Sequence, residues 1–460
     1  MKALLANIGF IMQMTGLFLI APIALALYQK LSADSVALLL CAVCFFMIGF
    51  ILNALCERKD LDFQESNILI VVSFIALGLI GALPYYNTVF GGQPFFERVT
   101  NSILESVSGF TTTGFSVISD LSVLSPPMIL YRALTQFIGG VGIVLLLLML
   151  FYPEEKLQTL AKSLGFFTNE RIKQTFTVIL VVYLLSGFLI GAGAYFMGFK
   201  DVVPLVSYIF AAMSSGGFSP ANDISVLDTN VFGNWIIAAM ILGGLNFFVI
   251  TNAARLRFGR VWNSEAPFYF VFLSAGAFVV HSLSTLNWHQ SLFHAVSAVT
   301  TTGFATVSLA AQSDGFKSFL VFLMFVGGCS FSTAGGIRIL RLFVIAKSIP
   351  YITARQITGD KKPLYVIDKE YNSFDIVVVM ASVLLFAGII IAGTVVVSSQ
   401  GYGVIDSLFE VVSALSCTGL SVGIVGAGTS LFLKWVFILL MLVGRIEIFT
   451  VLLAIFFWQE

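Results

Sequence analysis

The stretch SGFTTTGFS, residues 108–116, lies between long apolar segments and decides how the rest of the sequence is interpreted. Its three consecutive threonines are β-branched and stiff at χ1, whereas the glycine after them adopts positive φ without a Cβ clash. Neither property suits the interior of a membrane-crossing helix. The stretch therefore predicts a segment of irregular backbone between two apolar helices.

The composition is that of a polytopic membrane protein. Of the 460 residues, 58% are hydrophobic and 10% are charged, and the mean hydropathy is +0.99, whereas soluble domains carry about 25% charged residues. The formal net charge is zero, which gives no basis for binding nucleic acid or an acidic substrate. The first apolar run, to Tyr28, is longer than the apolar region of a signal peptide, so we expect a retained membrane helix there.

Ten apolar segments are long enough to cross a bilayer as helices, which takes about 20 residues. They lie near residues 4–28, 35–56, 67–87, 127–151, 175–199, 231–254, 267–285, 317–347, 373–398 and 430–458. Four shorter, less apolar segments lie between them, near residues 96–116, 203–219, 290–305 and 404–421. The sequence therefore predicts an all-α polytopic membrane protein with ten transmembrane helices and four re-entrant pore loops.

The distribution of Lys and Arg predicts how these helices are oriented, because cytoplasmic loops carry an excess of both residue types. If the N-terminus is cytoplasmic, 17 of these residues lie on the inner side and 6 on the outer side, with Arg445 inside a span. This asymmetry predicts a multi-pass protein with both termini in the cytoplasm. It also places the four short segments on the outer side.

The four short segments form an internal repeat. They align on four glycines as SGFTTTGF (108–115), AAMSSGGF (211–218), SAVTTTGF (297–304) and SALSCTGL (413–420). Nine residues before each glycine stand Glu105, Tyr208, His294 and Glu410. The two glutamates either attract cations or hydrogen-bond a neighbouring strand, and His294 is interpreted as structural. Four ordered copies indicate four covalently linked helix–pore-loop–helix units of fourfold pseudo-symmetry.

The repeated segments have the chemistry of an ion selectivity filter. Irregular backbone in a bilayer must be buried in protein or line water, and four such segments can surround one axis. Glycine lets successive carbonyls point the same way, and rings of carbonyl oxygens replace the hydration shell of a monovalent cation. Threonine hydroxyls either add oxygens or brace the strand. The candidate filter residues are Thr111, Thr112, Thr113, Gly114, Ser214, Ser215, Gly216, Gly217, Thr300, Thr301, Thr302, Gly303, Ser416, Cys417, Thr418 and Gly419.

The predicted span 317–347 is too long for one straight helix. A continuous helix of that length would measure about 46 Å, against a hydrocarbon core of about 30 Å. Its middle reads GGCSFSTAGG (327–336), which is a poor helix former. We therefore expect the helix to break into a loop beneath the filter. The alternative is a kinked helix that packs through small residues.

Arg445 lies in the middle of the last predicted span, in the stretch VGRIEIF. An arginine at mid-membrane costs about 2.5–3.5 kcal/mol on insertion scales, and such residues face the interior of the helix bundle. Snorkelling to the interface is the alternative, but the residue lies about 15 positions from either end of the predicted span. The sequence therefore favours a functional role for Arg445.

With these motifs, the chain resembles the Trk/Ktr/HKT superfamily of potassium transporters, and most closely its TrkH type. That family has four helix–pore-loop–helix units in one chain, a glycine in each filter segment, and two extra N-terminal helices in the TrkH branch. Ten spans and Gly114, Gly217, Gly303 and Gly419 match this pattern. Because serine at the first glycine is associated with sodium transport in plant relatives, the four glycines imply potassium selectivity. Gly216 and Leu420 depart from the pattern of the other repeats.

The resemblance also implies an organisation, a gate and partners. The units would be residues 1–62 (two extra helices), 63–173, 174–262, 263–369 and 370–460 (pore repeats one to four). The loop at 327–336 would gate the pore through Gly327, Gly328, Gly335 and Gly336, with Arg445 beside it beneath the filter. The protein would be a homodimer in the lipid of a bacterial-type plasma membrane, on a cytosolic, TrkA-like ring of nucleotide-binding regulatory subunits. It would bind K⁺ at the filter and no organic cofactor.

Three other functions are alternatives to this one. A symporter that couples K⁺ to Na⁺ or H⁺ usually carries acidic residues at the bilayer midplane, and the predicted spans hold almost none. A less selective Na⁺/K⁺ channel stays open as an alternative. An intramembrane enzyme is disfavoured, because the sequence has no HExxH motif and no clustered mid-span His/Asp pair.

Overall fold

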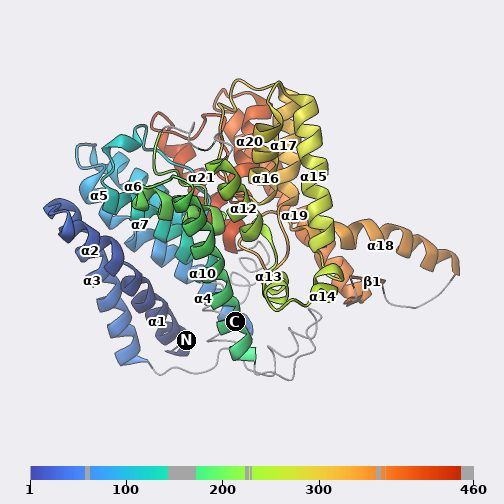
Figure 1. Cartoon of the computed structure of the whole chain (residues 1–460), viewed down its shortest axis with the longest axis horizontal. Coiled ribbons are helices and arrows are strands. Elements are labelled where there is room, and N and C mark those ends of the chain that lie inside the picture. The colour runs from blue at the N-terminus through green and yellow to red at the C-terminus, as the bar shows by residue number, and fades with distance from the viewer. Residues whose placement is uncertain are drawn as a thin grey trace.

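Helices form almost all of the regular structure in the computed structural model, which describes residues 2–56, 63–142, 172–222, 227, 231–358, 364–367 and 369–446 (Figure 1). Within these residues, six helices are long and apolar enough to cross a membrane, and a bent pair raises that number to seven. The chain is therefore a helical, multi-pass membrane protein.

The number of ten transmembrane helices stays a prediction. Two of the predicted spans, 127–151 and 430–458, continue past residues 142 and 446 and so lie partly outside the described residues. Lys156, Lys162 and Arg171, which are among the residues counted on the inner side, also lie outside them. The re-entrant character of the four short segments and the boundaries of the five units likewise stay predictions.

The N-terminal unit is a helical hairpin at one edge of the bundle, drawn in dark blue in Figure 1. It consists of α1 (Lys2–Phe18), α2 (Ile20–Tyr28) and α3 (Ser32–Leu55). Helices α1 and α3 pack closely where glycines face each other. A Cβ atom on Gly49 would lie 2.5 Å from the carbonyl oxygen of Gly9. Small residues of this kind let membrane helices approach backbone to backbone.

We expect the substitution Gly49→Leu to separate α1 from α3. The new side chain would meet Gly9 and Gln13 at contact distances below 3 Å, and overpacking of this kind costs about 1–3 kcal/mol. Thermal unfolding in detergent, followed by fluorescence, should show a lower midpoint. The matched control is Gly388→Leu, because a Cβ on Gly388 meets nothing within 4 Å. An equal loss of stability in the control would contradict the packing argument.

Each predicted repeat contains a long helix, a short helix and a further helix, in that order. In the first repeat these are α4 (Phe63–Ile80), α6 (Phe95–Phe110) and α7 (Pro126–Phe137), accompanied by α5 (Leu83–Thr88), the 3₁₀ helix η1 (Leu121–Val123) and the π-helix η2 (Ile138–Gly142). In the second they are α10 (Ile172–Phe196), α11 (Val202–Met213) and α12 (Phe232–Gly244). In the third they are α15 (Ala266–Leu283), α16 (Trp288–Val299) and α17 (Asp314–Val326). In the fourth they are α19 (Ser373–Ser398), α20 (Val404–Leu415) and α21 (Leu431–Ile446).

The predicted single span 231–254 is divided into two helices. Helix α12 ends at Gly244, and α13 (Phe247–Ala254) continues at an angle of 111° to it. The side chain of Asn246 caps α13 by accepting a hydrogen bond from the Phe248 amide. The glycine pair at 243–244 is a poor helix former, so the sequence held the signal for this break. A short helix, α14 (Phe258–Trp262), follows.

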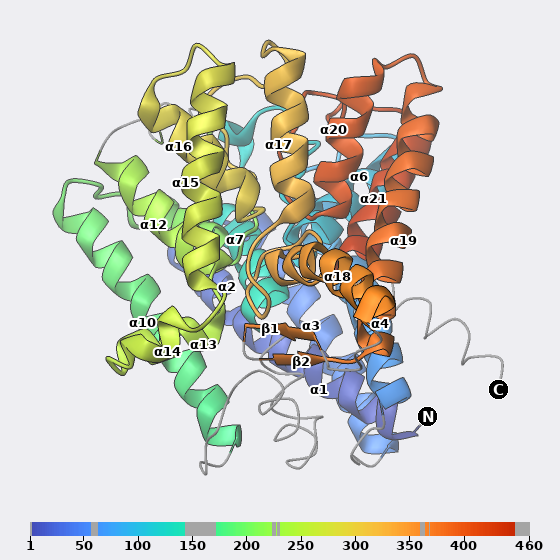
Figure 2. The ribbon, with the colours of Figure 1, turned by 90° about the vertical axis from the view of Figure 1, so that its right-hand side faces the viewer.

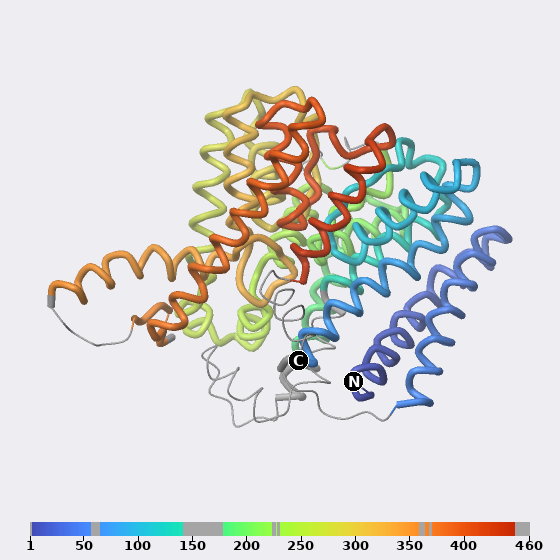
Figure 3. Tube along the Cα trace, turned by 180° about the vertical axis from the view of Figure 1, so that it is seen from behind, coloured from blue at the N-terminus to red at the C-terminus, as the bar shows by residue number. Residues whose placement is uncertain are grey.

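The segment after α17 leaves the helical path. Helix α17 ends at Val326, and α18 (Ile339–Thr358) then runs sideways out of the bundle (Figures 1 and 3). Beneath α18 lies an antiparallel hairpin of β1 (Leu364–Val366) and β2 (Lys369–Tyr371), which corrects the expectation of an all-α chain (Figure 2). Burial of Val366 and Tyr371 against Val344 of α18 explains why the hairpin forms here.

Candidate cation pathway

The four candidate filter segments, residues 111–114, 214–217, 300–303 and 416–419, share one backbone conformation at the C-terminal ends of the short helices α6, α11, α16 and α20. We call them the filter segments. In each, the residue two places before the aligned glycine has a left-handed φ of 51–54°, namely Thr112, Ser215, Thr301 and Cys417. The aligned glycines have φ values of +91° (Gly114), +72° (Gly217), +92° (Gly303) and +84° (Gly419). Side chains cost about 1–2 kcal/mol in this region, so the recurrence indicates a constrained geometry common to all four segments.

The aligned glycines and backbone oxygens close into a ring. A Cβ added to any of the four glycines would lie about 2 Å from the carbonyl oxygen just before the glycine of the next repeat. The pairs are Gly114 with Gly216 O (2.2 Å), Gly217 with Thr302 O (2.1 Å), Gly303 with Thr418 O (2.0 Å) and Gly419 with Thr113 O (1.9 Å). The order runs from repeat one through four and back to one. We call the oxygens of residues 113, 216, 302 and 418 the carbonyl ring.

Hydroxyl pairs brace the filter segments from behind. Thr111 Oγ1 lies 2.8 Å from Thr113 Oγ1, and the corresponding distances are 2.7 Å in repeats three and four. The first hydroxyl of each pair also donates to a carbonyl of its own short helix. These hydrogen bonds connect each filter strand to the end of its own short helix. Repeat two has Gly216 in place of the second hydroxyl.

The residue nine places before each aligned glycine holds the strand that leaves the filter. Glu105 accepts hydrogen bonds from the Ser116 hydroxyl and the Val117 amide, and Glu410 accepts from Ser421, Val422 and Val425. Tyr208 contacts Ser219 at 3.3 Å, and His294 Nε2 accepts from the Thr306 amide at 3.3 Å. All four side chains are buried. Both glutamates and His294 thus hydrogen-bond the strand that leaves the filter.

Arg132 of α7 links repeats one and two. It forms a buried ion pair with Glu105 at 3.5 Å and donates from Nη1 to the Ser219 carbonyl at 3.1 Å. Its guanidinium lies 4.0 Å from the ring centroid of Phe218. In the segments that follow the filter in these two repeats, Ser122 and Asn222 donate to Asp120, and these hydrogen bonds lower the pKa of its carboxyl. Polar contacts thus join the two repeats beside their filter segments.

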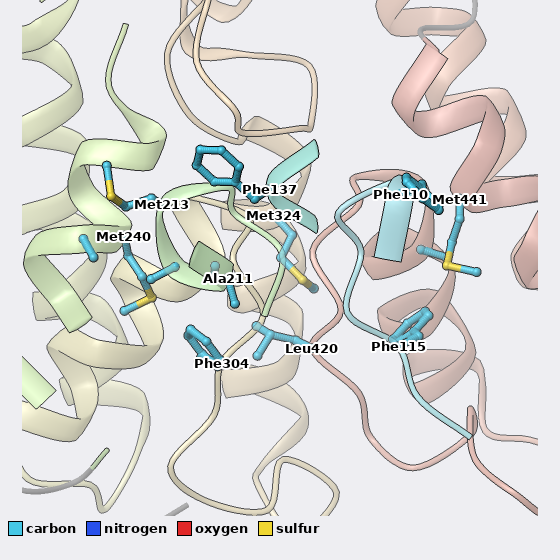
Figure 4. Packing of buried hydrophobic residues seen from close by; sticks show 14 of the residues in the cluster. Phe110, Phe115, Phe137, Ala211, Met213, Met240, Phe304, Met324, Leu420 and Met441 are labelled. Carbon is cyan, nitrogen blue, oxygen red and sulfur yellow. The ribbon is translucent and has the colours of Figure 1, made fainter. Parts of the chain in front are cut away.

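The residues that follow the aligned glycines anchor the filter in the apolar core. Phe115, Phe218, Phe304 and Leu420 are each at most 3% exposed. Figure 4 shows three of them, Phe115, Phe304 and Leu420, among the packed side chains. Phe115 packs edge-on against Phe437 of α21, with ring centroids 6.0 Å apart. Leu420 fills the same kind of site as the three phenylalanines, so its departure from the pattern preserves the packing.

The loop between α17 and α18, which we call the intramembrane loop, lies against the filter. The Gly335 amide donates to Thr301 Oγ1 at 2.7 Å, and Thr333 Oγ1 lies 2.6 Å from Ser215 Oγ. A Cβ on Gly335 would lie 2.0 Å from the Ser416 carbonyl oxygen. The loop therefore contacts filter residues of repeats two, three and four. It occupies the side of the filter where the short helices end.

Arg445 of α21 holds the intramembrane loop. Its Nη1 donates to the Thr333 carbonyl at 2.9 Å, and its Nη2 donates to the carbonyls of Gly139 and Gly140 at 2.8 and 3.3 Å. The last two residues belong to η2, where the helical ladder widens. One guanidinium thus ties repeat four to repeat one and to the loop. Of the predicted gate glycines, Gly327 and Gly336 have φ values of +73° and +75° and pack against each other.

The opposite side of the intramembrane loop rests on repeat two and on Glu265. The loop amides of Cys329 and Thr333 donate to the carbonyls of Gly244 and Gly243, which the break after α12 leaves free. Glu265 accepts from the Ser330 amide at 3.1 Å and from Asn246 at 2.9 Å. It lies just before the apolar span Ala266–Leu283, and burial raises the pKa of its carboxyl. Glu265 and the carbonyls of Gly243 and Gly244 thus hold the side of the loop that faces away from the filter.

The substitution Glu265→Gln should loosen this side of the intramembrane loop. Both carboxylate oxygens accept from donors, and glutamine offers only one acceptor. Losing one hydrogen bond of about 1 kcal/mol shifts a closed–open equilibrium about fivefold. We therefore expect cation uptake into liposomes without any partner subunit to rise by about that factor. The exposed Glu97→Gln serves as control, and unchanged uptake by Glu265→Gln would show that its contacts do not restrain the loop.

Comparison with known proteins places the chain in a family. A family model described as TrkH, cation transport protein, matches residues 37–265 and 258–458. The chain belongs to this family. TrkH proteins are cation transport proteins, not enzymes, and the ring and loop described above lie within the matched residues.

Relatives of this TrkH chain resemble it over nearly their whole length. An uncharacterized cation transporter of Methanocaldococcus jannaschii is 28% identical, over 98% of this chain and 94% of the relative. The Trk system potassium uptake protein TrkH of Escherichia coli is 26% identical over 88% of both chains. The crystal structure of the potassium transporter TrkH from Vibrio parahaemolyticus superposes with a TM-score of 0.82 at 22% identity, covering 98% of this chain and 97% of that one. This last comparison shows a common fold.

Sequence reasoning located the ring residues and Arg445 but missed several of the groups that hold them. Arg132 and Gln136 of α7 are two polar residues one helical turn apart in the apolar segment 127–151. This spacing places both on one face of the helix and indicated a polar contact there. Glu265 is an isolated acidic residue directly before an apolar span. Thr333 lay within the predicted loop but outside the four glycines chosen for the gate.

Proposed function

We propose that this TrkH chain conducts K⁺ into the cell through a single-chain, channel-like pore with the carbonyl ring as its selectivity filter. The observation that carries the proposal is the closed ring, in which four glycines of positive φ pack against four carbonyl oxygens. Such rings replace the hydration shell of a monovalent cation. K⁺ as the ion is supported by a relative that is named a potassium uptake protein and that aligns with this chain over 88% of its length.

Uptake through such a pore needs no chemical energy source in this chain. An interior-negative potential supplies about 2.3 kcal/mol per charge for each 100 mV. At about 1.4 kcal/mol per tenfold, this permits roughly 40-fold accumulation. The sequence has no GxxxxGK[ST] motif for binding a nucleotide phosphate. Any nucleotide control would therefore act through another subunit.

The intramembrane loop and Arg445 would form the gate of this pore. The loop contacts filter residues of three repeats, and Arg445 places a positive charge beside it. An arginine in a pore excludes cations. Opening would thus require the loop and Arg445 to move away together.

A cytosolic, nucleotide-binding regulatory ring would control that movement. The relatives carry the name of a Trk system, and the loop continues directly into α18. Helices α14 and α18 expose both basic and apolar side chains, among them Arg260, Trp262, Lys347 and Ile357, and Arg257 is exposed just before α14. A surface of this composition suits a protein partner. We extend the proposal to a homodimer in the plasma membrane, with both termini cytoplasmic.

Uptake of ⁸⁶Rb⁺ into liposomes tests the proposal. The purified chain, in vesicles with an interior-negative potential, should accumulate ⁸⁶Rb⁺, and external K⁺ should compete at concentrations at least about tenfold below Na⁺. The variant Arg445→Gln, in which the proposed gate should be open, is measured in parallel. Equal competition by Na⁺ would overturn K⁺ selectivity, and no uptake by either protein would overturn the pore.

A further inference from the structure

The filter segment of repeat two lacks the threonine side chain that the other three repeats have just before the aligned glycine. Repeats one, three and four have Thr113, Thr302 and Thr418, whereas repeat two has Gly216. A Cβ on Gly216 would lie 2.4 Å from Cδ and 2.6 Å from Oε1 of Gln136. The side chain of Gln136, from α7 of repeat one, therefore fills the space that a threonine would take.

Gln136 also makes hydrogen bonds that a threonine hydroxyl would not make. Its Nε2 donates to the Gly216 carbonyl oxygen, and its Oε1 accepts from the Phe218 amide at 3.2 Å. Because a backbone amide can only donate, the orientation of the side-chain amide is fixed. The side chain is completely buried. Gln136 thus holds the segment on both sides of the aligned Gly217.

The acceptor of that hydrogen bond is itself a member of the carbonyl ring. Gly216 O is the oxygen against which Gly114 packs, as the other ring oxygens do against the remaining glycines. A carbonyl oxygen has two lone pairs, so it can accept from Gln136 and still face a cation. The contact therefore fixes the position of one quarter of the ring from a different repeat.

The corresponding positions of the other repeats carry methionine. Gly139, Gly243 and Gly444 each pack against the carbonyl four residues before the aligned glycine of their own repeat. Three residues before them stand Gln136, Met240 and Met441, and three before Gly327, the first glycine of the pair in repeat three, stands Met324. All four side chains are fully buried, and Figure 4 shows the three methionines in the core. The position that Gln136 occupies in repeat one is therefore apolar in the three other repeats.

Arg132 acts on the same segment from one helical turn earlier on α7. Residues four apart lie on one face of a helix. Arg132 reaches the Ser219 carbonyl and lies over Phe218, while Gln136 reaches Gly216 and Phe218. One face of α7 therefore contacts residues 216–219 of the neighbouring repeat through two polar side chains.

From this arrangement we infer that Gln136 is a specificity-determining positioning residue of the filter, which replaces the missing threonine of repeat two and holds the Gly216 carbonyl in the ring. The inference rests on the proposed function, since it concerns how the same ring selects K⁺. It predicts that Gln136 and Gly216 act as a pair, so that each tolerates change only together with the other.

The test compares Gln136→Met, Gly216→Thr and the double variant, which gives repeat two the residue pair of the other repeats. The readout is the ratio of the K⁺ and Na⁺ concentrations that halve ⁸⁶Rb⁺ uptake into liposomes. Gln136→Met frees the Gly216 carbonyl, and Gly216→Thr collides with Gln136, so each should lower the preference for K⁺ about tenfold. In the double variant, this concentration ratio should return to within about threefold of the wild-type ratio.

Two controls separate selectivity from folding. Tyr131→Phe removes another buried hydrogen bond of α7, to the Gly81 carbonyl at 2.7 Å, and should leave the ratio unchanged. Gel filtration and thermal unfolding report folding for every variant. An unchanged ratio in Gln136→Met, or single losses that simply multiply in the double variant, would overturn the inference. A wild-type protein without K⁺ preference would instead overturn the proposed function.

Discussion

The substitution Gly419→Ala is expected to abolish the preference for K⁺. Gly419 has a φ of +84°, and a Cβ there would lie 1.9 Å from the Thr113 carbonyl oxygen. Real Cβ atoms do not approach an oxygen so closely, so the Thr113 carbonyl must leave the ring or the strand must shift. Because the ring oxygens replace the ion's hydration shell, a displaced member removes part of that shell. We expect K⁺ and Na⁺ to compete with ⁸⁶Rb⁺ within about threefold of each other.

The matched control for this prediction is Gly423→Ala. Gly423 also has a positive φ, +98°, but a Cβ there meets nothing within 4 Å. Both substitutions therefore bear the same backbone cost of about 1–2 kcal/mol, and only the first one disturbs the ring. Gly423→Ala should lose some thermal stability and keep its preference for K⁺. A Gly419→Ala protein that still prefers K⁺ would show that the ring does not determine selectivity. Gly114→Ser should lose the preference for K⁺ in the same way as Gly419→Ala.

The parts of the candidate site that could be predicted from the sequence are those that occur in all four repeats. Each filter segment repeats a glycine at the same place, and four copies identify a backbone requirement that one copy would not. The break in 317–347 was also predictable, since GGCSFSTAGG is too poor a helix former to cross a membrane unbroken. The break after Gly244 carries a similar signal in the pair 243–244, but the apolar residues around it suggested one continuous span.

The contacts that hold the filter were beyond sequence reasoning, because their partners lie far apart in the chain. Gln136 acts on Gly216, 80 residues away, and Arg445 acts on Gly139, 306 residues away. Neither spacing has a local periodicity from which a contact follows. Only the packing of repeats around an axis brings these groups together. The departure of Gly216 from the repeat pattern was visible in the sequence, but its compensation by Gln136 required the structure.

The intramembrane loop and the filter form one hydrogen-bonded unit. Thr333 contacts Ser215, and Gly335 contacts Thr301. Ser215 and Thr301 both have the left-handed φ that recurs in each filter segment. Withdrawal of the loop would therefore leave two filter hydroxyl groups without these contacts. If the loop gates the pore as proposed, the strength of the hydrogen bonds that hold it sets how much cation should pass in the absence of a partner subunit.

Arg445→Gln should produce the largest leak of any single change at the gate. The guanidinium donates to three carbonyls, of Thr333, Gly139 and Gly140, and hydrogen bonds from charged groups contribute about 1.5–3 kcal/mol each. Loss of one such tie alone shifts the closed–open equilibrium about 10- to 100-fold. Removing the positive charge also lowers the barrier to a cation. Uptake of ⁸⁶Rb⁺ into liposomes without any partner subunit should rise by at least about tenfold.

Arg445→Lys separates the two causes of this leak. Lysine keeps the positive charge but replaces the planar fork of donors with a single ammonium group, which cannot reach three carbonyls on two elements in the same geometry. If the ties close the gate, the lysine variant should leak nearly as much as Arg445→Gln. If the charge alone blocks cations, it should stay as closed as wild type. Wild-type uptake in both variants would contradict a role for Arg445 in the gate.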